Sequence, residues 1–425
     1  MTKKFQTLKG FYDVLPARQG LWRYFEEKVL YILDQYHYQE IGLPLVETTG
    51  LFIESVGSHT DIVEKEMYSW EDHLNQDKLT LRPEGTAGCV RAIVENSLTY
   101  NGPVKLFYRG AMFRHENVQK GRQRQFHQVG VEAFGLEKPE SDAEQILLLA
   151  RLWKSLGLKN ITLELNSIGD PSDRIVYREK LIEYFESNKE ILDDDALRRL
   201  YKNPLRILDS KNKQMQPMLN SAPKLIDYLS NDAKQHFEDL CSILKGYDLE
   251  FKINTRLVRG LDYYNRTVFE WVSNDLGSQG TIAGGGRYDY LVERIGGKPT
   301  SACGFAIGIE RIILLLEDLN KENNNILPDV YIVNLGDMAR PFAFVTAEKL
   351  RNEGLMVSLN LEGSSFKSQM KKADKSGAKV ALIIGDQEAE KKIIQVKLIR
   401  DDGIQESVEE KNISLYIKDK INFEK

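Results

Sequence analysis

Hydrophobic positions recur at helical spacing near the start of the chain and alternate with polar positions further along. From Leu21 to about Tyr36 the apolar residues repeat every three or four positions, which predicts a long amphipathic helix. Residues 104–113 and 125–134 both have strand patterns, and the segment between them is polar, basic and free of proline. The pair therefore predicts an antiparallel hairpin with a long loop at its tip, a favoured place for substrate contacts.

The next stretch changes from mixed to helical and back. Residues 142–156 predict a helix and residues 161–166 a strand, whereas about 171 to 247 is helical with almost no strand signal. Strand patterning resumes at 249–254. We interpret residues 171–247 as a helical insertion inside a β-rich domain.

Two glycine-containing segments follow. Residues 279–288 are glycine-rich and predict a turn region. Residues 304–308 predict a buried strand that leads directly into a helix over 309–316. A polar, asparagine-rich segment, residues 317–328, then predicts a linker.

The last part of the chain alternates strands and helices over about 95 residues, which predicts a small mixed α/β domain. Its expected elements are strands at 329–334, 355–360 and 379–384, helices at 339–353 and 364–376, and a further strand with Ile394, Val396 and Leu398 on one face.

Composition narrows the class of protein. Apolar residues make up 42% and charged residues 28%, as in ordinary soluble proteins, and no segment approaches the roughly 18 consecutive apolar residues of a membrane span. No secretory signal is visible at the start. Cys89, Cys241 and Cys303 are far apart and odd in number, which argues against a disulfide framework or a cysteine zinc site. We expect a cytoplasmic protein without a membrane association.

The net charge of −5 gives no bulk attraction to nucleic acid, although a local basic groove would suffice. One candidate patch is Lys120, Arg122 and Arg124. The lysines between residues 367 and 379 form another, for which a solvated helix face is the simpler interpretation.

The most informative stretch is residues 256–268, Arg-Leu-Val-Arg-Gly-Leu-Asp-Tyr-Tyr-Asn-Arg-Thr-Val. It places the fixed charge of Arg259 near two adjacent phenols, Tyr263 and Tyr264. A guanidinium beside paired hydroxyls suits a site that handles a phosphate and a small polar molecule together.

Three other segments fit the same kind of site. They are Arg-Pro-Glu-Gly-Thr at 82–86, Phe-Arg-His-Glu at 113–116 running on to Gln128, and Gly-Phe-Ala-Ile-Gly-Ile-Glu-Arg at 304–311. Each segment alone has a structural explanation, but their occurrence together and in this order does not. His115 and His127 could suggest a metal site, yet both fall on the hairpin without a third ligand, so we expect no protein-bound metal.

Together these segments resemble the histidyl-tRNA synthetases, a class II aminoacyl-tRNA synthetase family. Pro44 with the preceding helix resembles motif 1, residues 113–116 with the hairpin motif 2, and residues 304–311 motif 3. Residues 257–264 and 283–288 resemble the histidine-specific signatures. The resemblance covers essentially the whole chain from Gly10 onward.

The resemblance implies an α+β catalytic domain built on an antiparallel sheet at 1–325, with the helical insertion at about 171–247, and a C-terminal α/β anticodon-binding domain at 329–425. It also implies ATP-dependent activation of L-histidine to histidyl-adenylate, then transfer of histidine to the 3′ end of histidine tRNA with release of AMP and pyrophosphate. Mg²⁺ would accompany ATP. Motif 1 implies a homodimer.

The resemblance also assigns residues. Arg114 would hold the α-phosphate, and Arg259 would lie by the α-phosphate and the histidine carboxylate, so these two are the expected catalytic residues. The other expected ATP-binding residues are Glu116 at the adenine amino group, Phe126 stacked on adenine, Arg311 at the γ-phosphate, and Arg122 or Arg124 assisting from the loop. The other expected histidine-binding residues are Glu84, Gly85, Thr86 and Gln128 at the ammonium and backbone end, and Glu132, Tyr263, Tyr264 and Tyr288 around the imidazole.

One departure and two alternatives stand beside this interpretation. Many family members carry Arg-Pro after the motif 2 glutamate, whereas this chain has Asn117-Val118, which leaves the loop contact to the tRNA acceptor end open. The main alternative is a non-catalytic, synthetase-like regulatory subunit of histidine biosynthesis. Such relatives usually lack the C-terminal domain and the intact 257–264 segment. A class II synthetase for threonine or proline would not explain residues 257–264 and 284–288.

Overall fold

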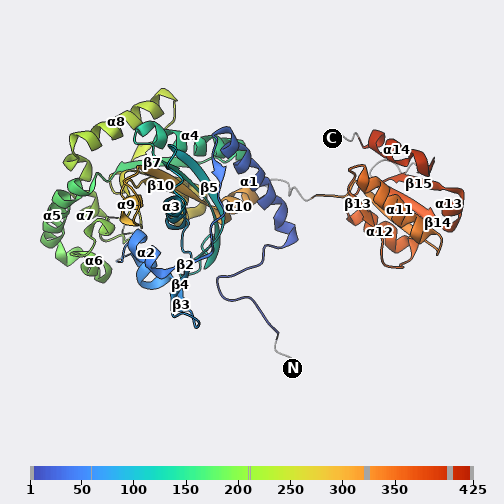
Figure 1. Ribbon diagram of the computed structural model, residues 1–425, viewed down its shortest axis with the longest axis horizontal. Coiled ribbons are helices and arrows are strands. Elements are labelled where there is room, and N and C mark those ends of the chain that lie inside the picture. Colours follow the sequence, from blue (N-terminus) through green and yellow to red (C-terminus); the bar gives the residue numbers. More distant parts are fainter. Residues whose placement is uncertain are drawn as a thin grey trace. The chain divides into compact units, whose positions relative to one another are not determined.

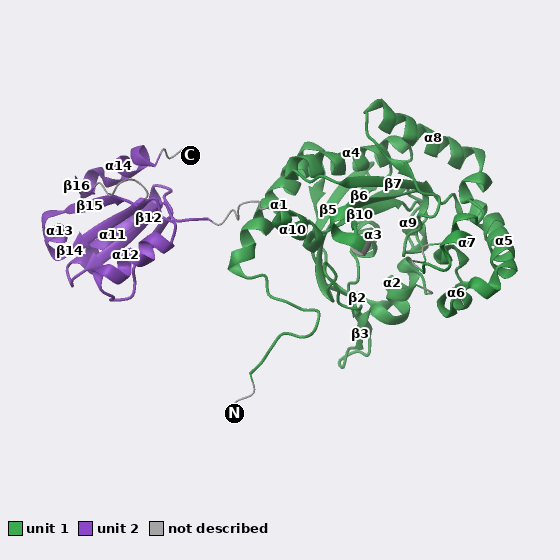
Figure 2. Cartoon of the chain, turned by 180° about the vertical axis from the view of Figure 1, so that it is seen from behind, with its two compact units in different colours: residues 1–323 green, residues 324–425 purple. Residues whose placement is uncertain are grey.

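The chain forms two compact units, residues 1–323 and 324–425, in a computed structural model (Figure 2). The structure describes residues 4–58, 60–208, 210, 212–319, 326–399 and 405–421. Part of the expected linker, residues 320–325, lies outside them. None of the helices in the described ranges is both long and apolar enough to cross a membrane.

The first unit is built on an eight-stranded sheet with the order β1-β5-β6-β11-β10-β9-β7-β8. Its six central strands pair antiparallel, while β1 and β8 add parallel at the two edges. The strands are β1 (Gln39–Glu40), β5 (Val104–Phe113), β6 (Gln125–Phe134), β7 (Ile161–Ser167), β8 (Lys252–Ile253), β9 (Asn265–Ser273), β10 (Thr281–Arg287) and β11 (Ala302–Gly308). A separate three-stranded sheet contains β2 (Val46–Thr48), β3 (Tyr68–Glu71) and β4 (Lys78–Leu81).

Helices cover the large sheet on both faces (Figure 1). The largest apolar core joins one face to α1 (Pro16–Gln35), α4 (Pro139–Leu156), α8 (Asn231–Gly246) and α10 (Ile309–Asp318). A second core on the other face includes α3 (Thr86–Glu95) and α9 (Leu291–Arg294) together with a group of buried tyrosines. The sheet therefore presents the tyrosine-rich face, and not the α1–α4 face, to the predicted site residues.

Between α4 and β9 the described residues from 171 to 246 contain helices and no strand. These are α5 (Pro171–Ser187), α6 (Asp194–Arg199), α7 (Gln216–Asn220) and α8, with short helical turns η2 (Lys189–Ile191), η3 (Pro204–Ile207) and η4 (Leu225–Tyr228). Residues from α5 to η4 share their own apolar core. Near the amino end, α2 (Thr49–Val56) is followed by η1 (Ile62–Glu66).

The second unit is a five-stranded mixed sheet with the order β13-β12-β14-β15-β16. Its elements are β12 (Val330–Leu335), α11 (Ala339–Asn352), β13 (Val357–Leu359), α12 (Phe366–Lys375), β14 (Val380–Gly385), α13 (Asp386–Lys391), β15 (Ile393–Leu398), β16 (Gln405–Glu409), η6 (Glu410–Asn412) and α14 (Ile413–Lys420). The predicted fold class, an antiparallel α+β domain followed by an α/β domain, is confirmed.

Two local predictions were wrong. Residues 279–288 do not form a turn region, because 281–287 is strand β10 in the middle of the sheet. Its glycines are there for close packing: a Cβ at Gly285 would lie 2.1 Å from the Gly304 carbonyl oxygen, and one at Gly284 would lie 2.6 Å from the Arg259 guanidinium. The strand expected at 249–254 is reduced to β8, since only two of its residues pair with β7 at the sheet edge.

Candidate active site

The hairpin β5–β6 carries site residues on one face by simple alternation. Along β6 the side chains of Phe126, Gln128 and Glu132 share a face, whereas Val129 and Val131 point into the α1–α4 core. On β5, Tyr108 pairs in register with Gly130 and so lies on the same face. The strand period thus brings these residues toward one side of the sheet.

Glu132 lies at the centre of a buried hydroxyl cluster. Thr86 donates to Oε1 of Glu132 at 2.8 Å, Tyr108 donates to the same oxygen at 2.9 Å, and Tyr288 donates to Oε2. The carboxyl is only 1% exposed, and this burial raises the pKa of Glu132 to about 8 even though the three hydroxyl donors oppose the shift. Because its pKa lies near neutral pH, this carboxyl can gain or lose a proton when a ligand binds.

Two glycines pack closely against the ring of Tyr108. A Cβ at Gly85 would lie 2.0 Å from the ring, and one at Gly130 would lie 2.2 Å from it. Neither position can therefore carry a side chain without displacing the tyrosine. The two glycines leave space on both sides of the Tyr108 ring, and this space positions the phenol next to Glu132.

Glu84 caps the amino end of α3. Its carboxylate accepts from the backbone N–H groups of Thr86, at 2.8 Å, and Ala87, at 2.9 Å. Burial raises the pKa of Glu84, while these bonds act in the opposite direction. The arrangement holds a second carboxyl next to the Glu132 cluster and turns the Thr86 hydroxyl toward it.

Three tyrosines pack around each other beside this cluster. The ring centroids of Tyr263 and Tyr264 lie 4.6 Å apart, and those of Tyr263 and Tyr288 lie 5.5 Å apart. Burial raises the pKa of all three phenols, so they are neutral hydrogen-bonding groups. Residues from the 256–264 and 281–288 segments thus meet in one wall of the site.

Buried ion pairs hold Arg287, the residue that precedes Tyr288 in the chain. Arg287 is fully buried and contacts both Asp142 of α4 and Asp289, the latter at 3.0 Å. Burial alone would raise the pKa of Asp142, but the charges and hydrogen bonds of Arg287 and His236 together outweigh it and hold the value at about 2. The end of β10 is therefore tied to α4 by charge, in addition to its own pairing with β9 and β11 in the sheet.

The guanidinium of Arg259 is held beside the site by an ion pair with a carboxylate. Its guanidinium pairs with Glu270 of β9 and lies 5.8 Å from the ring centre of Tyr264. Glu270 also accepts from the hydroxyl of Thr281 at 2.8 Å, and the carbonyl of Thr281 accepts from Arg311. Glu270 and Thr281 thereby connect the arginine expected at the histidine carboxylate with the arginine expected at the γ-phosphate.

The remaining predicted residues gather on the hairpin side. The Arg114 guanidinium lies 5.2 Å from the ring centre of Phe126 and donates to the carbonyl of Pro83 at 2.8 Å. Glu116 pairs with Arg122 at 3.1 Å, and burial raises the pKa of Glu116. Burial lowers the pKa of Arg311, and nearby Arg122 adds to that effect.

The structure therefore brings the predicted residues together in two adjoining groups. One contains Glu84, Gly85, Thr86, Glu132, Tyr263, Tyr264 and Tyr288, and the other contains Arg114, Glu116, Arg122, Phe126 and Arg311. Arg259 lies beside Tyr264 and connects to Arg311 through Glu270 and Thr281. Gln128 is half-buried on β6 between Phe126 and Glu132. Within the described residues, no group of three His, Cys, Asp or Glu side chains is placed to hold a metal ion.

Residues 10–312 match the family described as histidyl-tRNA synthetase, and residues 329–420 match the anticodon binding domain. The chain belongs to the histidyl-tRNA synthetase family. A histidine–tRNA ligase from Methylobacillus flagellatus is 61% identical, over 95% of this chain and 97% of the relative. One from Nitrosomonas eutropha is 51% identical over 98% and 100%. The solved apo histidyl-tRNA synthetase from S. aureus is 35% identical with a TM-score of 0.82, and covers 98% of this chain.

Two residues of this histidyl-tRNA synthetase site were missed from sequence. Tyr108 could have been found because it pairs with Gly130 across the hairpin. Gly130 and Glu132 are two residues apart on β6, so Tyr108 lies on the same face of the sheet as Glu132. Glu270 is a single acidic residue inside the apolar strand sequence Val-Phe-Glu-Trp-Val, which is a signal of a functional carboxylate.

Proposed function

We propose that this chain is a histidine–tRNA ligase that activates L-histidine with ATP and then transfers it to histidine tRNA. The observation that carries the proposal is the buried Glu132 cluster, in which one carboxyl accepts from three hydroxyls. Arg259 lies beside the adjoining tyrosines, 5.8 Å from the ring centre of Tyr264. Full-length histidine–tRNA ligases at 51–61% identity support it.

Glu132 is proposed to accept an imidazole N–H of histidine. Thr86, Tyr108 and Tyr288 hold its two oxygens in fixed positions. An amino acid without a matching N–H would leave the remaining acceptor position of this buried carboxyl unfilled. Sites of this kind reject analogues strongly, because the penalty falls on a desolvated polar group. Glu84, Thr86 and Gln128 are proposed to meet the α-ammonium end.

The second group is proposed to bind ATP. The stacked Arg114 and Phe126 offer a guanidinium for the α-phosphate and an aromatic face for adenine, 5.2 Å apart. Glu116 would accept from the adenine amino group, with Arg311 and Arg122 on the γ-phosphate. Mg²⁺ would enter with the ATP phosphates, which supply most of its ligands.

The chemical step is an in-line attack of the histidine carboxylate on the α-phosphate, and pyrophosphate leaves. Both reactants are anions, so alignment and positive charge are what the protein must supply. Arg259 and Arg114 are proposed to stabilise the charge that develops on the α-phosphate oxygens. By analogy with the loss of one oxyanion donor, each would contribute about 3–4 kcal/mol in the transition state.

The wider partners follow from the same proposal. Histidine tRNA would receive the amino acid at its 3′-terminal ribose, and the second unit would bind the anticodon. The anticodon binding domain match supports this part. We also propose a homodimer through the motif 1 region, and a cytoplasmic location, which suits three buried free cysteines.

The non-catalytic regulatory subunit is the second candidate, and the site disfavours it. Arg259, Arg114 and Arg311 are all present together with the phosphate-facing hairpin, although a subunit that only binds histidine needs none of them. The chain also retains a C-terminal unit that matches an anticodon binding domain.

Histidine-dependent ATP–pyrophosphate exchange, run in parallel with the other amino acids, tests the proposal. We expect exchange with histidine alone. Exchange with threonine or proline in place of histidine would assign the chain to another class II specificity. No exchange with any amino acid, from folded protein that still binds histidine, would favour the regulatory candidate.

A further inference from the structure

The residues that carry the histidine signature, 256–264, form neither helix nor strand. We call them the signature loop. The loop lies between the 171–246 helices on one side and α2 on the other, where the N–H of Asp262 donates to the Val56 carbonyl at 3.0 Å. A loop without a backbone ladder of its own takes its position from such contacts.

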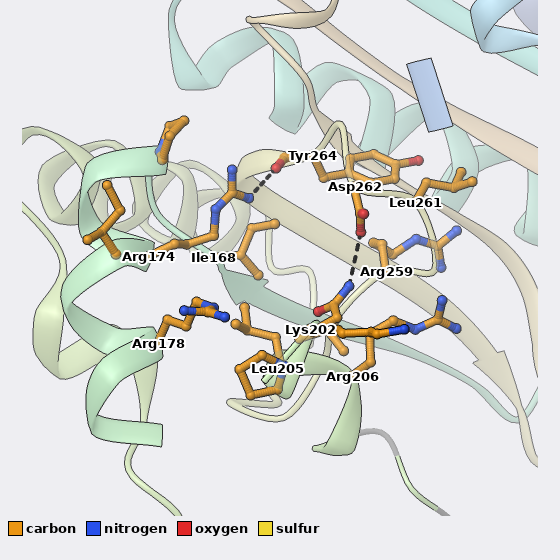
Figure 3. A pocket seen from close by; sticks show the side chains of 15 residues that line it. Ile168, Arg174, Arg178, Lys202, Leu205, Arg206, Arg259, Leu261, Asp262 and Tyr264 are labelled. Carbon is orange, nitrogen blue, oxygen red and sulfur yellow. Dashed lines mark hydrogen bonds between the residues drawn. The ribbon is translucent and has the colours of Figure 1, made fainter. Parts of the chain in front are cut away.

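A cavity of about 290 Å³ separates part of the loop from the helices (Figure 3). Its lining includes Arg174 and Arg178 of α5 and Leu205 of η3 on one side, and Leu261 and Asp262 on the other. Close packing is interrupted here. The hydrogen bonds that cross the cavity therefore carry a larger share of the loop's placement than they would in a filled interface.

Arg174 makes the most direct of these crossings. From the second turn of α5 its guanidinium donates to the backbone carbonyl of Tyr264, a contact drawn as a dashed line in Figure 3. Nearby, Asn203 donates to Oδ1 of Asp262 at 3.3 Å. Burial lowers the pKa of Arg174, although Asp262 opposes the shift, so the cation occupies a largely desolvated position where an unmade bond is costly.

The start of the loop is held by the same helices. Arg256 donates to the carbonyl of Leu208 at 3.0 and 3.1 Å and to Oδ1 of Asn220 at 2.8 Å. Both ends of the signature loop are thus bonded to residues between 171 and 246. Arg259, Tyr263 and Tyr264 lie between or at these anchor points.

We propose that Arg174 is a positioning residue for histidine, and that through it the helical insertion forms part of the amino-acid site. Arg174 does not reach the reactants in this arrangement; it acts by fixing the backbone at Tyr264 and hence the phenols and Arg259. The inference rests on the proposed function. Its consequence is that a change on α5 alters histidine affinity in the absence of any tRNA.

The test compares Arg174→Ala with Arg178→Ala in pyrophosphate exchange without tRNA. Arg178 is a matched control, because it is one turn further along α5 and lines the same cavity, yet its bond goes to the carbonyl of Tyr201 within the insertion. We expect Arg174→Ala to raise KM for histidine about tenfold, the usual effect of losing one bond from a charged donor, and to leave KM for ATP unchanged. Arg178→Ala should leave both constants unchanged.

A conservative variant separates positioning from folding. Arg174→Lys keeps one donor and should recover part of the histidine affinity, with a melting temperature equal to that of Arg174→Ala. An unchanged KM for histidine in folded Arg174→Ala would overturn the inference. An equal rise in both KM values, or the same effect in Arg178→Ala, would also overturn it, because either result indicates a general loss of structure.

Equilibrium dialysis with histidine keeps this test independent of catalysis. If the wild-type protein binds histidine without exchanging pyrophosphate, the proposed function fails, while weaker histidine binding by Arg174→Ala would still support the positioning role. Equal histidine affinity of the two proteins would contradict it.

Discussion

The phenol oxygen of Tyr108 lies 2.9 Å from Oε1 of Glu132, and the tyrosine ring is enclosed between Gly85 and Gly130. The hydroxyl also lies 3.4 Å from that of Thr86, which shares the same carboxylate oxygen. Tyr108 therefore fixes the direction of the acceptor that is proposed to recognise histidine.

Replacing Tyr108 by phenylalanine should weaken histidine recognition. The ring still fills its space, but Glu132 loses one of three donors and gains orientational freedom. We expect KM for histidine in pyrophosphate exchange to rise about fivefold to tenfold, as for the loss of one buried hydrogen bond. Tyr177→Phe is the control, since its buried hydroxyl bonds to the carbonyl of Pro223 in the insertion. Equal KM values for the two variants would contradict the role of Tyr108.

Gly130→Ala should destabilise the protein through the same ring. The new Cβ would lie 2.2 Å from Tyr108, and the hairpin register leaves it no room to move away. Overpacking of this kind costs about 1–3 kcal/mol in the free energy of unfolding. Gly50→Ala is a suitable comparison, because nothing lies within 4 Å of its Cβ position in α2. Denaturant unfolding of both variants measures the difference, and equal midpoints would rule out the clash.

Glu132 should make stability fall as pH rises. Burial raises the pKa of Glu132 from 4.5 to about 8, so the folded protein retains a proton that the unfolded chain has released. Folding therefore binds an extra proton between these values. The contribution of Glu132 is present below about pH 4.5 and is lost as pH rises through about 8, by up to about 1.4 kcal/mol per pH unit.

Glu132→Gln isolates this contribution from that of other titrating groups. Its free energy of unfolding should depend less on pH between about 5 and 8 than that of the wild type. The exposed Glu137→Gln is the control and should keep the wild-type slope. Identical slopes for wild type and Glu132→Gln would mean that the carboxyl is ionised throughout this range.

Arg259→Ala should reduce histidine activation by about 10²–10³ if its charge acts in the transition state. Single-turnover formation of histidyl-adenylate measures this directly. Arg109→Ala is the control, because it removes an arginine that pairs with Glu40 and Glu26 at the surface. It should have no effect on the rate. A wild-type rate in folded Arg259→Ala would remove this residue from the mechanism.

Deleting residues 329–425 should separate the two steps of the reaction. The second unit has its own apolar core, including Val330, Ile332 and Val380, so the deletion takes nothing from the core beneath the active site. Adenylate formation should persist while charging of tRNA falls. Loss of both activities in equal measure would mean that the first unit depends on the second for its fold or assembly.

Sequence patterns predicted the hairpin well because its two strands alternate cleanly. The expected ranges 104–113 and 125–134 coincide with β5 and β6, and the residues expected at its end, Arg114 and Phe126, contact each other. Local periodicity was enough here, since one face of each strand is apolar and the other carries the site.

Long-range packing explains what the sequence did not reveal. The glycines at 284–286 look like a turn, but their function is to let Arg259, Phe305 and the β11 backbone approach a central strand. The lone acidic residue Glu270 in an apolar strand was a local signal, but its contacts with Arg259 and Thr281 depend on the folded arrangement. The residue roles themselves came from the family resemblance and stay predictions.

We propose that this one protein both recognises histidine through Glu132 and delivers it to tRNA. The most direct test is aminoacylation of purified histidine tRNA by the full-length chain, with histidine and with a non-cognate amino acid as substrates. We expect ATP-dependent formation of histidyl-tRNA from histidine alone, with AMP released in equal amount. Failure to charge histidine tRNA, by protein that binds both histidine and ATP, would contradict it.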